Sequence, residues 1–122
     1  MEKASQEVLV IDDEPAVRYV IKRLLEQDGY GVTLAADGRE ALELAQVGAV
    51  PDLIMLDLCM PVMSGYEVLS SMRSTRGWAK IPVIVMSGDH GFSADHLGVA
   101  ACIEKPFNVA VVRAAVAAAL GR

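Results

Sequence analysis

The sequence has few cysteine, aromatic and basic residues. Its 2 cysteines among 122 residues, Cys59 and Cys102, are too few for a disulfide scaffold and lack the spacing of a zinc site. We interpret them as reduced thiols of a cytoplasmic protein, and the sequence leaves open whether they pair. The 11 Lys and Arg residues are outnumbered by 16 Asp and Glu residues, and the net charge of −5 argues against direct nucleic-acid binding.

Long hydrophobic runs are also missing. No run approaches the length of a membrane span, and the first residues, MEKASQE, lack the apolar core of a signal peptide. The sequence also has no P-loop and no G-x-G-x-x-G pattern, so nothing in it supports a nucleotide-hydrolysing enzyme. We therefore expect a cytoplasmic domain with no membrane partner.

What the chain does contain is an alternation of short apolar runs and longer amphipathic segments. Hydrophobic residues make up 53% of the sequence, enough for the core of one domain over residues 1–122. The short runs predict strands at Glu7–Ile11, Gly31–Ala35, Leu53–Asp57, Pro82–Met86 and Ala101–Glu104. The other segments predict helices from Pro15 to Gly29, from Asp37 to Gly48, over Gly65–Ser74, weakly around Ser93–Gly98, and over Asn108–Leu120.

Strands this apolar, separated by helices, are typical of a parallel sheet with helices on both faces. Right-handed crossovers make the simplest arrangement a doubly wound, flavodoxin-like α/β fold with five parallel strands in the order 2-1-3-4-5. In that order, the carboxyl ends of strands one, three, four and five lie together. Five polar residues at those ends would meet at one edge of the sheet: Asp12, Asp13, Asp57, Ser87 and Lys105.

These five residues carry complementary chemistry for a phosphoryl group. Three neighbouring carboxylates repel one another unless a cation intervenes, and oxygen ligands with room for water favour Mg²⁺ over zinc or copper. Lys105 adds a positive charge, Ser87 adds a hydroxyl, and Asp57 can be the attacking oxygen of an in-line phosphoryl transfer. Each residue alone has a simpler interpretation. The acidic pair Asp12-Asp13 can cap a helix, the serine can belong to a turn, and the lysine can be solvated.

The order of these motifs resembles the receiver domain of bacterial two-component response regulators over essentially the whole chain. The matching motifs are Asp12-Asp13 after the first strand, Asp57 with Met60-Pro61 and Gly65 following, Ser87 at the end of the fourth strand, and Lys105-Pro106-Phe107 after the fifth. The resemblance implies that Asp57 accepts a phosphoryl group from a phosphohistidine of a sensor histidine kinase or phosphotransfer protein. Phosphorylation would then change the binding of a downstream protein, and the domain would not be a turnover enzyme.

The resemblance also implies individual roles. Mg²⁺ would be held by Asp13, Asp57 and the backbone carbonyl of Cys59, with Asp12 acting partly through water, while Lys105 and Ser87 would hold the phosphoryl group. The Lys105–Pro106 peptide bond would be cis, an arrangement confined almost entirely to bonds before proline.

Two features depart from the family pattern and affect switching. Cys102, three residues before Lys105, replaces the aromatic residue or histidine that rotates inward when the family switches. The segment from Ser87 to Lys105 is also about one helical turn shorter than the resemblance leads us to expect. We hypothesise that Ser87 still moves on phosphorylation, without an aromatic partner at Cys102.

Two other functions fit the sequence less well. A phosphatase or phosphomutase with an Asp nucleophile would carry a second acid two residues after it, where this chain has Cys59. A degenerate receiver that only scaffolds is disfavoured because the five polar residues are intact. The chain is either a protein that acts alone or the receiver part of a longer regulator or hybrid kinase, and the sequence does not identify its kinase, stimulus or target.

The last helix is apolar on nearly every side, because Arg113 is the only polar residue from Val109 to Leu120. This pattern predicts a docking or homodimer surface, although alanine is also simply a good helix former.

Overall fold

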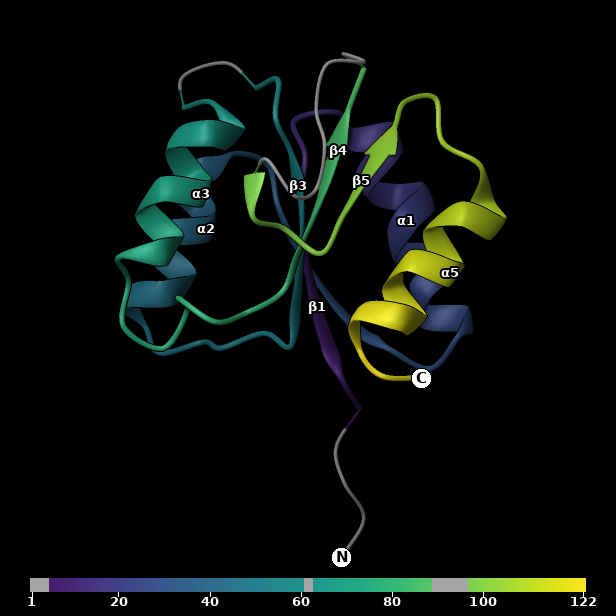
Figure 1. Cartoon of the computed structure of the whole chain (residues 1–122), viewed down its shortest axis with the longest axis horizontal. Coiled ribbons are helices and arrows are strands. Elements are labelled where there is room, and N and C mark those ends of the chain that lie inside the picture. The colour runs from purple at the N-terminus through teal and green to yellow at the C-terminus, as the bar shows by residue number, and fades with distance from the viewer. Residues whose placement is uncertain (1–4, 61–62, 89–96) are drawn as a thin grey trace, which may run out of the picture.

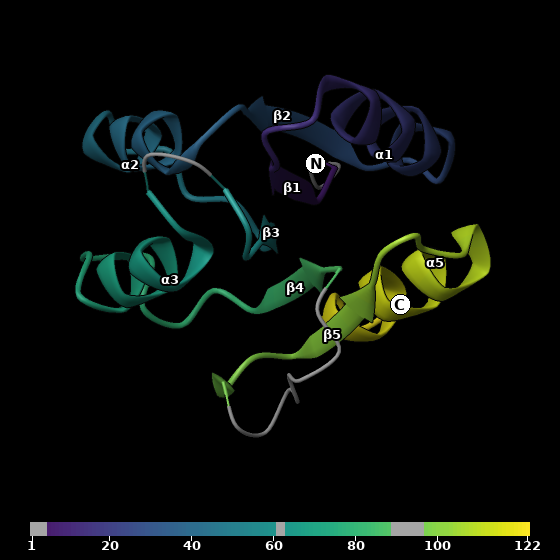
Figure 2. The same cartoon turned by 90° about the horizontal axis from the view of Figure 1, so that it is seen from above.

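The sheet is fully parallel and its strands follow the order β2-β1-β3-β4-β5, four of which are labelled in Figure 1 and all five in Figure 2. The computed structural model describes residues 5–60, 63–88 and 97–122. The strands are β1 (Glu7–Ile11), β2 (Gly31–Ala35), β3 (Leu53–Asp57), β4 (Val83–Ser87) and β5 (Ala101–Glu104), and the helices are α1 (Pro15–Gln27), α2 (Gly38–Gln46), α3 (Gly65–Arg73) and α5 (Val109–Ala119). The predicted fold class and strand order are confirmed.

The helices form two layers around the sheet. Figure 2 shows α1 and α5 on one face, with α2 and α3 on the other. Successive side chains of β3 point to opposite faces of the sheet. Ile54 and Leu56 pack toward α2 and α3, whereas Leu53 and Met55 pack toward α1 and α5. Every residue of β3 is buried. Because helices cover both faces of the sheet, the sequence of this strand is an unbroken apolar run and does not alternate between apolar and polar residues.

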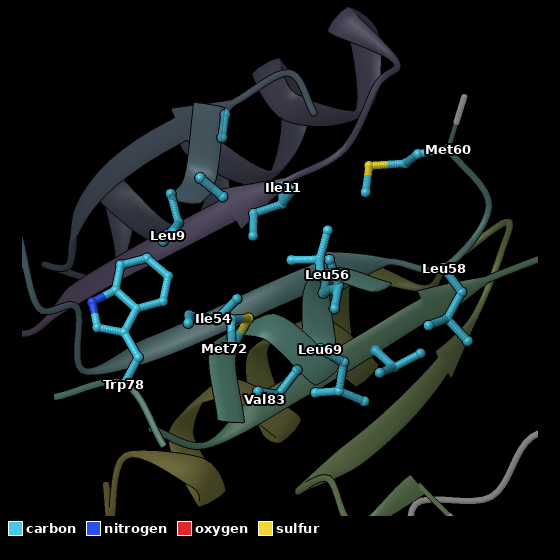
Figure 3. Packing of buried hydrophobic residues seen from close by; sticks show 14 residues of the cluster. Leu9, Ile11, Ile54, Leu56, Leu58, Met60, Leu69, Met72, Trp78 and Val83 are labelled. Atoms are coloured by element: carbon cyan, nitrogen blue, oxygen red, sulfur yellow. The ribbon is translucent and has the colours of Figure 1, made fainter. Parts of the chain in front are cut away.

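Trp78, in the connection between α3 and β4, packs against the core on the face of the sheet covered by α2 and α3. Its ring lies near Leu9 of β1 and Ile54 of β3 (Figure 3), and only 2% of Trp78 is exposed. The indole N–H donates a hydrogen bond of 2.7 Å to the carbonyl of Ala49. The polar atom of a large buried side chain is thereby satisfied, so burial of the ring leaves no unpaired donor.

The helix starts follow local capping chemistry. Asp37 precedes α2 and its carboxylate accepts from the Glu40 backbone N–H at 2.9 Å. Ser64 precedes α3 and exchanges side-chain and backbone hydrogen bonds with Glu67, which forms a capping box. The Asn108 side chain accepts from the Ala110 N–H at the start of α5. These caps fix where the helices begin after each loop.

The fourth strand differs from the prediction by one residue. It was expected over Pro82–Met86 and instead spans Val83–Ser87. Pro82 has no N–H to donate and offers only its carbonyl, which accepts from Ile54 N at 3.1 Å. At the other end, the Ser87 carbonyl accepts from Lys105 N at 2.8 Å, so pairing continues through Ser87. The serine is therefore held by the sheet itself.

One predicted helix lies mostly outside the described residues, namely the weak helix around Ser93–Gly98. Among the residues that the structure does describe, no helix is long and apolar enough to cross a membrane.

Candidate functional site

Four adjacent strand ends bring the predicted polar residues together. Asp12 follows β1, Asp57 and Ser87 are the last residues of β3 and β4, and Lys105 follows β5. The Lys105 Nζ lies 2.7 Å from Asp12 Oδ2 and 3.4 Å from Asp57 Oδ2. Asp12 and Lys105 are far apart in sequence, so the parallel order of the sheet creates this cluster. The site lies at the carboxyl edge, where open α/β sheets bind ligands.

Both central carboxylates are buried and held by backbone N–H groups. Asp12 is 0% exposed and Asp57 is 3% exposed. One oxygen of Asp12 accepts from Glu14 N at 2.9 Å, and one oxygen of Asp57 accepts from Cys59 N at 3.1 Å. In each carboxylate the other oxygen faces Lys105. The two groups therefore have fixed orientations and a shared cationic neighbour.

The simpler interpretations of the acidic pair and the lysine do not match this arrangement. The residue that caps α1 is Glu14, and its side chain makes no capping hydrogen bond. The Lys105 side chain is only 16% exposed, so it is not a solvated surface lysine. The acidic pair and Lys105 therefore belong to the cluster at the carboxyl edge of the sheet.

Close contact between α3 and the end of β3 fixes the position of Asp57. A Cβ atom at Gly65 would lie 2.5 Å from Leu58 Cα and would collide with the carbonyl oxygen of Asp57. The Gly65 N–H donates to the Leu58 carbonyl at 3.0 Å. The helix thus begins directly against the strand end, and only glycine allows that approach.

The electrostatics of the site favour a bound cation. Burial raises the pKa of Asp57 to about 6. The hydrogen bond from the Cys59 N–H and the charge of Lys105 act to lower this pKa, whereas the charge of Asp12 acts to raise it. Burial also lowers the pKa of Lys105, but the hydrogen bond and charge of Asp12 and the charge of Asp57 outweigh it and raise that pKa to about 12. Lys105 is therefore firmly cationic, yet one ammonium does not compensate for the buried carboxylates.

A carboxylate cluster of suitable size for a metal ion lies in this site. Asp12, Asp13 and Asp57 each offer an oxygen, and these oxygens lie within 4.8 Å of one another. The donor set is oxygen only, which fits a hard cation such as Mg²⁺ better than zinc or copper. The Cys59 thiol is exposed, while the backbone of this residue lies beside the Asp57 carboxylate.

The remaining predicted residues are also located. Ser87 is 4% exposed. The Lys105–Pro106 peptide bond is cis. Cys102 lies on β5 opposite Val85 and packs, half-buried, against the core on the α2 and α3 face. Burial raises the pKa of its thiol.

Sequence reasoning missed Glu14 as a site residue. Its Oε1 lies 3.2 Å from Lys105 Nζ. It lines an open cleft together with Val17, Phe107, Asp57 and Lys105. The available signal was the run of three acids, Asp12-Asp13-Glu14, of which only the first two were assigned to the site.

Comparisons with known proteins identify the family of the chain. The family model described as response regulator receiver domain matches residues 8–117. The chain is 38% identical over 119 residues to "Response regulator MprA" of Mycolicibacterium vanbaalenii, covering 94% of this chain and 50% of that protein. The chain thus spans about half the length of the curated relative.

Two solved structures are similar over almost their whole length. Chemotaxis protein CheY4 of Vibrio cholerae has a TM-score of 0.87 and 31% identity, covering 96% of this chain and 100% of that one. The second is the receiver domain of sensor histidine kinase PA1611 from Pseudomonas aeruginosa, with a TM-score of 0.86 and 28% identity, covering 98% of this chain and 100% of that one. That structure has a magnesium ion coordinated in its active-site cleft. The resemblance indicated by the motifs is confirmed.

Proposed function

The chain belongs to the response regulator receiver domain family of two-component systems, and from this premise we propose that Asp57 is its phosphoacceptor. The phosphoryl donor is a phosphohistidine of a sensor histidine kinase or phosphotransfer protein. The observation that carries the proposal is the position of Asp57, whose carboxylate is buried, fixed by a backbone N–H and 3.4 Å from the Lys105 ammonium. We propose that residues 1–122 form one such domain and that it works in the cytoplasm.

The transfer needs positioning more than acid–base chemistry. An Asp57 oxygen attacks phosphorus in line with the bond to the imidazole nitrogen. As the new P–O bond forms, the P–N bond breaks and its electron pair stays on the imidazole, which takes up a proton. Lys105 and the Ser87 hydroxyl donate hydrogen bonds to the phosphoryl oxygens and hold the group in line. The product is an acyl phosphate on Asp57.

The three clustered carboxylates, with the Cys59 backbone carbonyl, are the residues that would hold Mg²⁺. When bound, Mg²⁺ neutralises negative charge on the phosphoryl oxygens and on the carboxylates around them. The similar receiver domain from Pseudomonas aeruginosa, which has magnesium in its active-site cleft, supports this assignment.

Phosphorylation changes the charge and the side-chain packing around Asp57, and these changes transmit the signal. Phosphorylation adds about −1.5 to −2 charges at Asp57. We propose that Ser87 moves toward the new group and that Cys102, in the place of an aromatic residue, does not take part by ring rotation. The result is a changed affinity for a downstream protein. Cys59 stands where an Asp-nucleophile phosphatase would need a second acid, which disfavours that activity, and we propose that the domain is not a turnover enzyme.

Acetyl phosphate tests the phosphoacceptor directly. We expect the wild-type protein, with acetyl phosphate and Mg²⁺, to gain the mass of one phosphoryl group in intact-mass spectrometry, and to gain none when EDTA removes the metal. Asp57→Asn should gain none under either condition. The matched control is Asp52→Asn, next to the opposite end of β3, which should behave as wild type. Phosphate uptake that persists in Asp57→Asn, or its absence in wild type, would refute the proposal.

A further inference from the structure

The Lys105 ammonium is fully occupied by carboxylates. It donates hydrogen bonds to Asp12 at 2.7 Å and to Glu14 at 3.2 Å, and it is paired with Asp57 at 3.4 Å. A lysine has three N–H donors and no more. A phosphoryl group that arrives at this site can therefore bind Lys105 only if one of the three carboxylates is displaced.

The three carboxylates differ sharply in how readily they can leave. The side chains of Asp12 and Asp57 are 0% and 4% exposed, whereas that of Glu14 is 60% exposed. Each buried carboxylate is also held by a backbone N–H on its other oxygen, so it does not turn away from the site. An exposed one is solvated by water and loses little. Glu14 is therefore the partner that Lys105 releases.

The turn that carries Glu14 is held in place at two points. Its backbone N–H donates to Asp12 Oδ1 at 2.9 Å, and the carbonyl of Asp12 accepts from Arg18 Nη1 at 2.6 Å. The backbone of the turn is thus fixed while the glutamate side chain extends toward the cleft. That cleft is the open side of the site, lined also by Val17, Pro106 and Phe107.

From these contacts we infer that Glu14 is a positioning residue that competes with the incoming phosphoryl group for Lys105. It holds the ammonium between the buried carboxylates in the resting site, and its exposed charge on the wall of the cleft disfavours anionic donors. When a phosphoryl group binds, Lys105 turns to it and Glu14 moves into solvent. Glu14 thereby slows phosphorylation by small anionic donors. The inference rests on the proposed function, because it assigns a role in that same reaction.

The test is the initial rate of phosphorylation by acetyl phosphate in Glu14→Gln, which removes the charge and keeps the length of the side chain. We expect the KM for acetyl phosphate to fall about 3- to 10-fold, with a smaller change in kcat, and the difference to shrink as salt screens the charge. A merely structural role for Glu14 would not produce this salt dependence. Glu14→Asp keeps the charge and should retain the salt dependence of wild type.

The matched control is Glu26→Gln, which removes an exposed, ion-paired acid near the other end of α1. It should leave the KM unchanged. An unchanged or higher KM in Glu14→Gln, in protein that unfolds at the wild-type temperature, would overturn the inference and leave Asp57 as the phosphoacceptor. A wild type that takes up no phosphate would instead overturn the proposed function, and this inference with it.

Discussion

A single carboxylate, Asp57, makes the stability of the fold depend on pH when no metal is bound. Its pKa is about 6 in the folded protein against 3.8 for the free group, chiefly because of burial. The folded state therefore binds this proton more tightly than the unfolded state. It follows that stability falls as pH rises from about 4 to about 6, and that the loss is complete above that window.

Asp57→Asn removes this penalty. Near neutral pH in EDTA, we expect its free energy of unfolding to exceed that of wild type by about 1–3 kcal/mol, and the difference to disappear near pH 4. Urea unfolding at a series of pH values measures it, with Asp52→Asn as the control. A difference that does not change with pH would show that Asp57 is not the group responsible.

At the level of individual residues, the sequence identified those whose position follows from the end of a strand. Asp57 could be found because an apolar run stops there, and Lys105 because it follows the fifth run. Glu14 could not be found in this way. Its contact joins residues 91 positions apart and depends on how two long side chains are oriented, which no local pattern encodes.

At the level of elements, Arg73 connects α3 to the segment before β5. Its Nη2 donates to the carbonyls of Leu97 and Gly98 at 2.6 and 2.9 Å. Gly98 has a positive φ of 68°, and a Cβ there would lie 3.2 Å from that same nitrogen. One charged group thus satisfies two carbonyls in a turn that favours glycine.

We expect Arg73→Ala to lower the free energy of unfolding by about 1–2 kcal/mol, because two charge-assisted hydrogen bonds are lost from a partly exposed site. Urea unfolding measures the loss, and amide exchange of residues 97–100 should speed up. Arg39→Ala, an exposed arginine at the start of α2, serves as the control. Unchanged stability together with unchanged exchange would mean that the arginine contributes nothing to this connection.

Element types were predictable because each is set by short-range patterns. The unbroken run in β3 reflects burial on both faces, and Asp37 and Asn108 reveal helix starts because their side chains accept local backbone N–H groups. The one-residue error in β4 arose at both ends: apolar character reaches back to Pro82, which has no N–H to donate, and stops at Met86, although Ser87 still pairs with β5. Hydrogen bonding, and not hydrophobicity, decided that boundary.

At the level of the whole molecule, the strand order followed from the alternation of elements and the right-handed crossover rule. That order suffices to place four strand ends at one edge, which is why the site was predictable before any distance was known. What covers the outer faces of the helices does not follow from the same rules, because intramolecular packing determines only the inner face of each helix.

The outward side of α5 is such a face. Val112 and Val116 point into the core, whereas Val111 is 51% exposed. Ala114 is exposed on the same side of the helix as Val111. We propose that this side forms a homodimer interface, because small side chains let two helices approach closely and a twofold contact buries the same residues on both copies.

Sedimentation of the purified protein over a range of concentrations tests this proposal. We expect wild type to associate reversibly and Val111→Lys to remain a monomer, because a twofold interface would bring the two new charges together in an apolar contact. Val47→Lys, 80% exposed just after α2, introduces the same charge on the opposite side of the sheet and should associate like wild type. A wild-type protein that stays monomeric at high concentration, with and without acetyl phosphate and Mg²⁺, would leave the apolar outer side of α5 without a role in self-association.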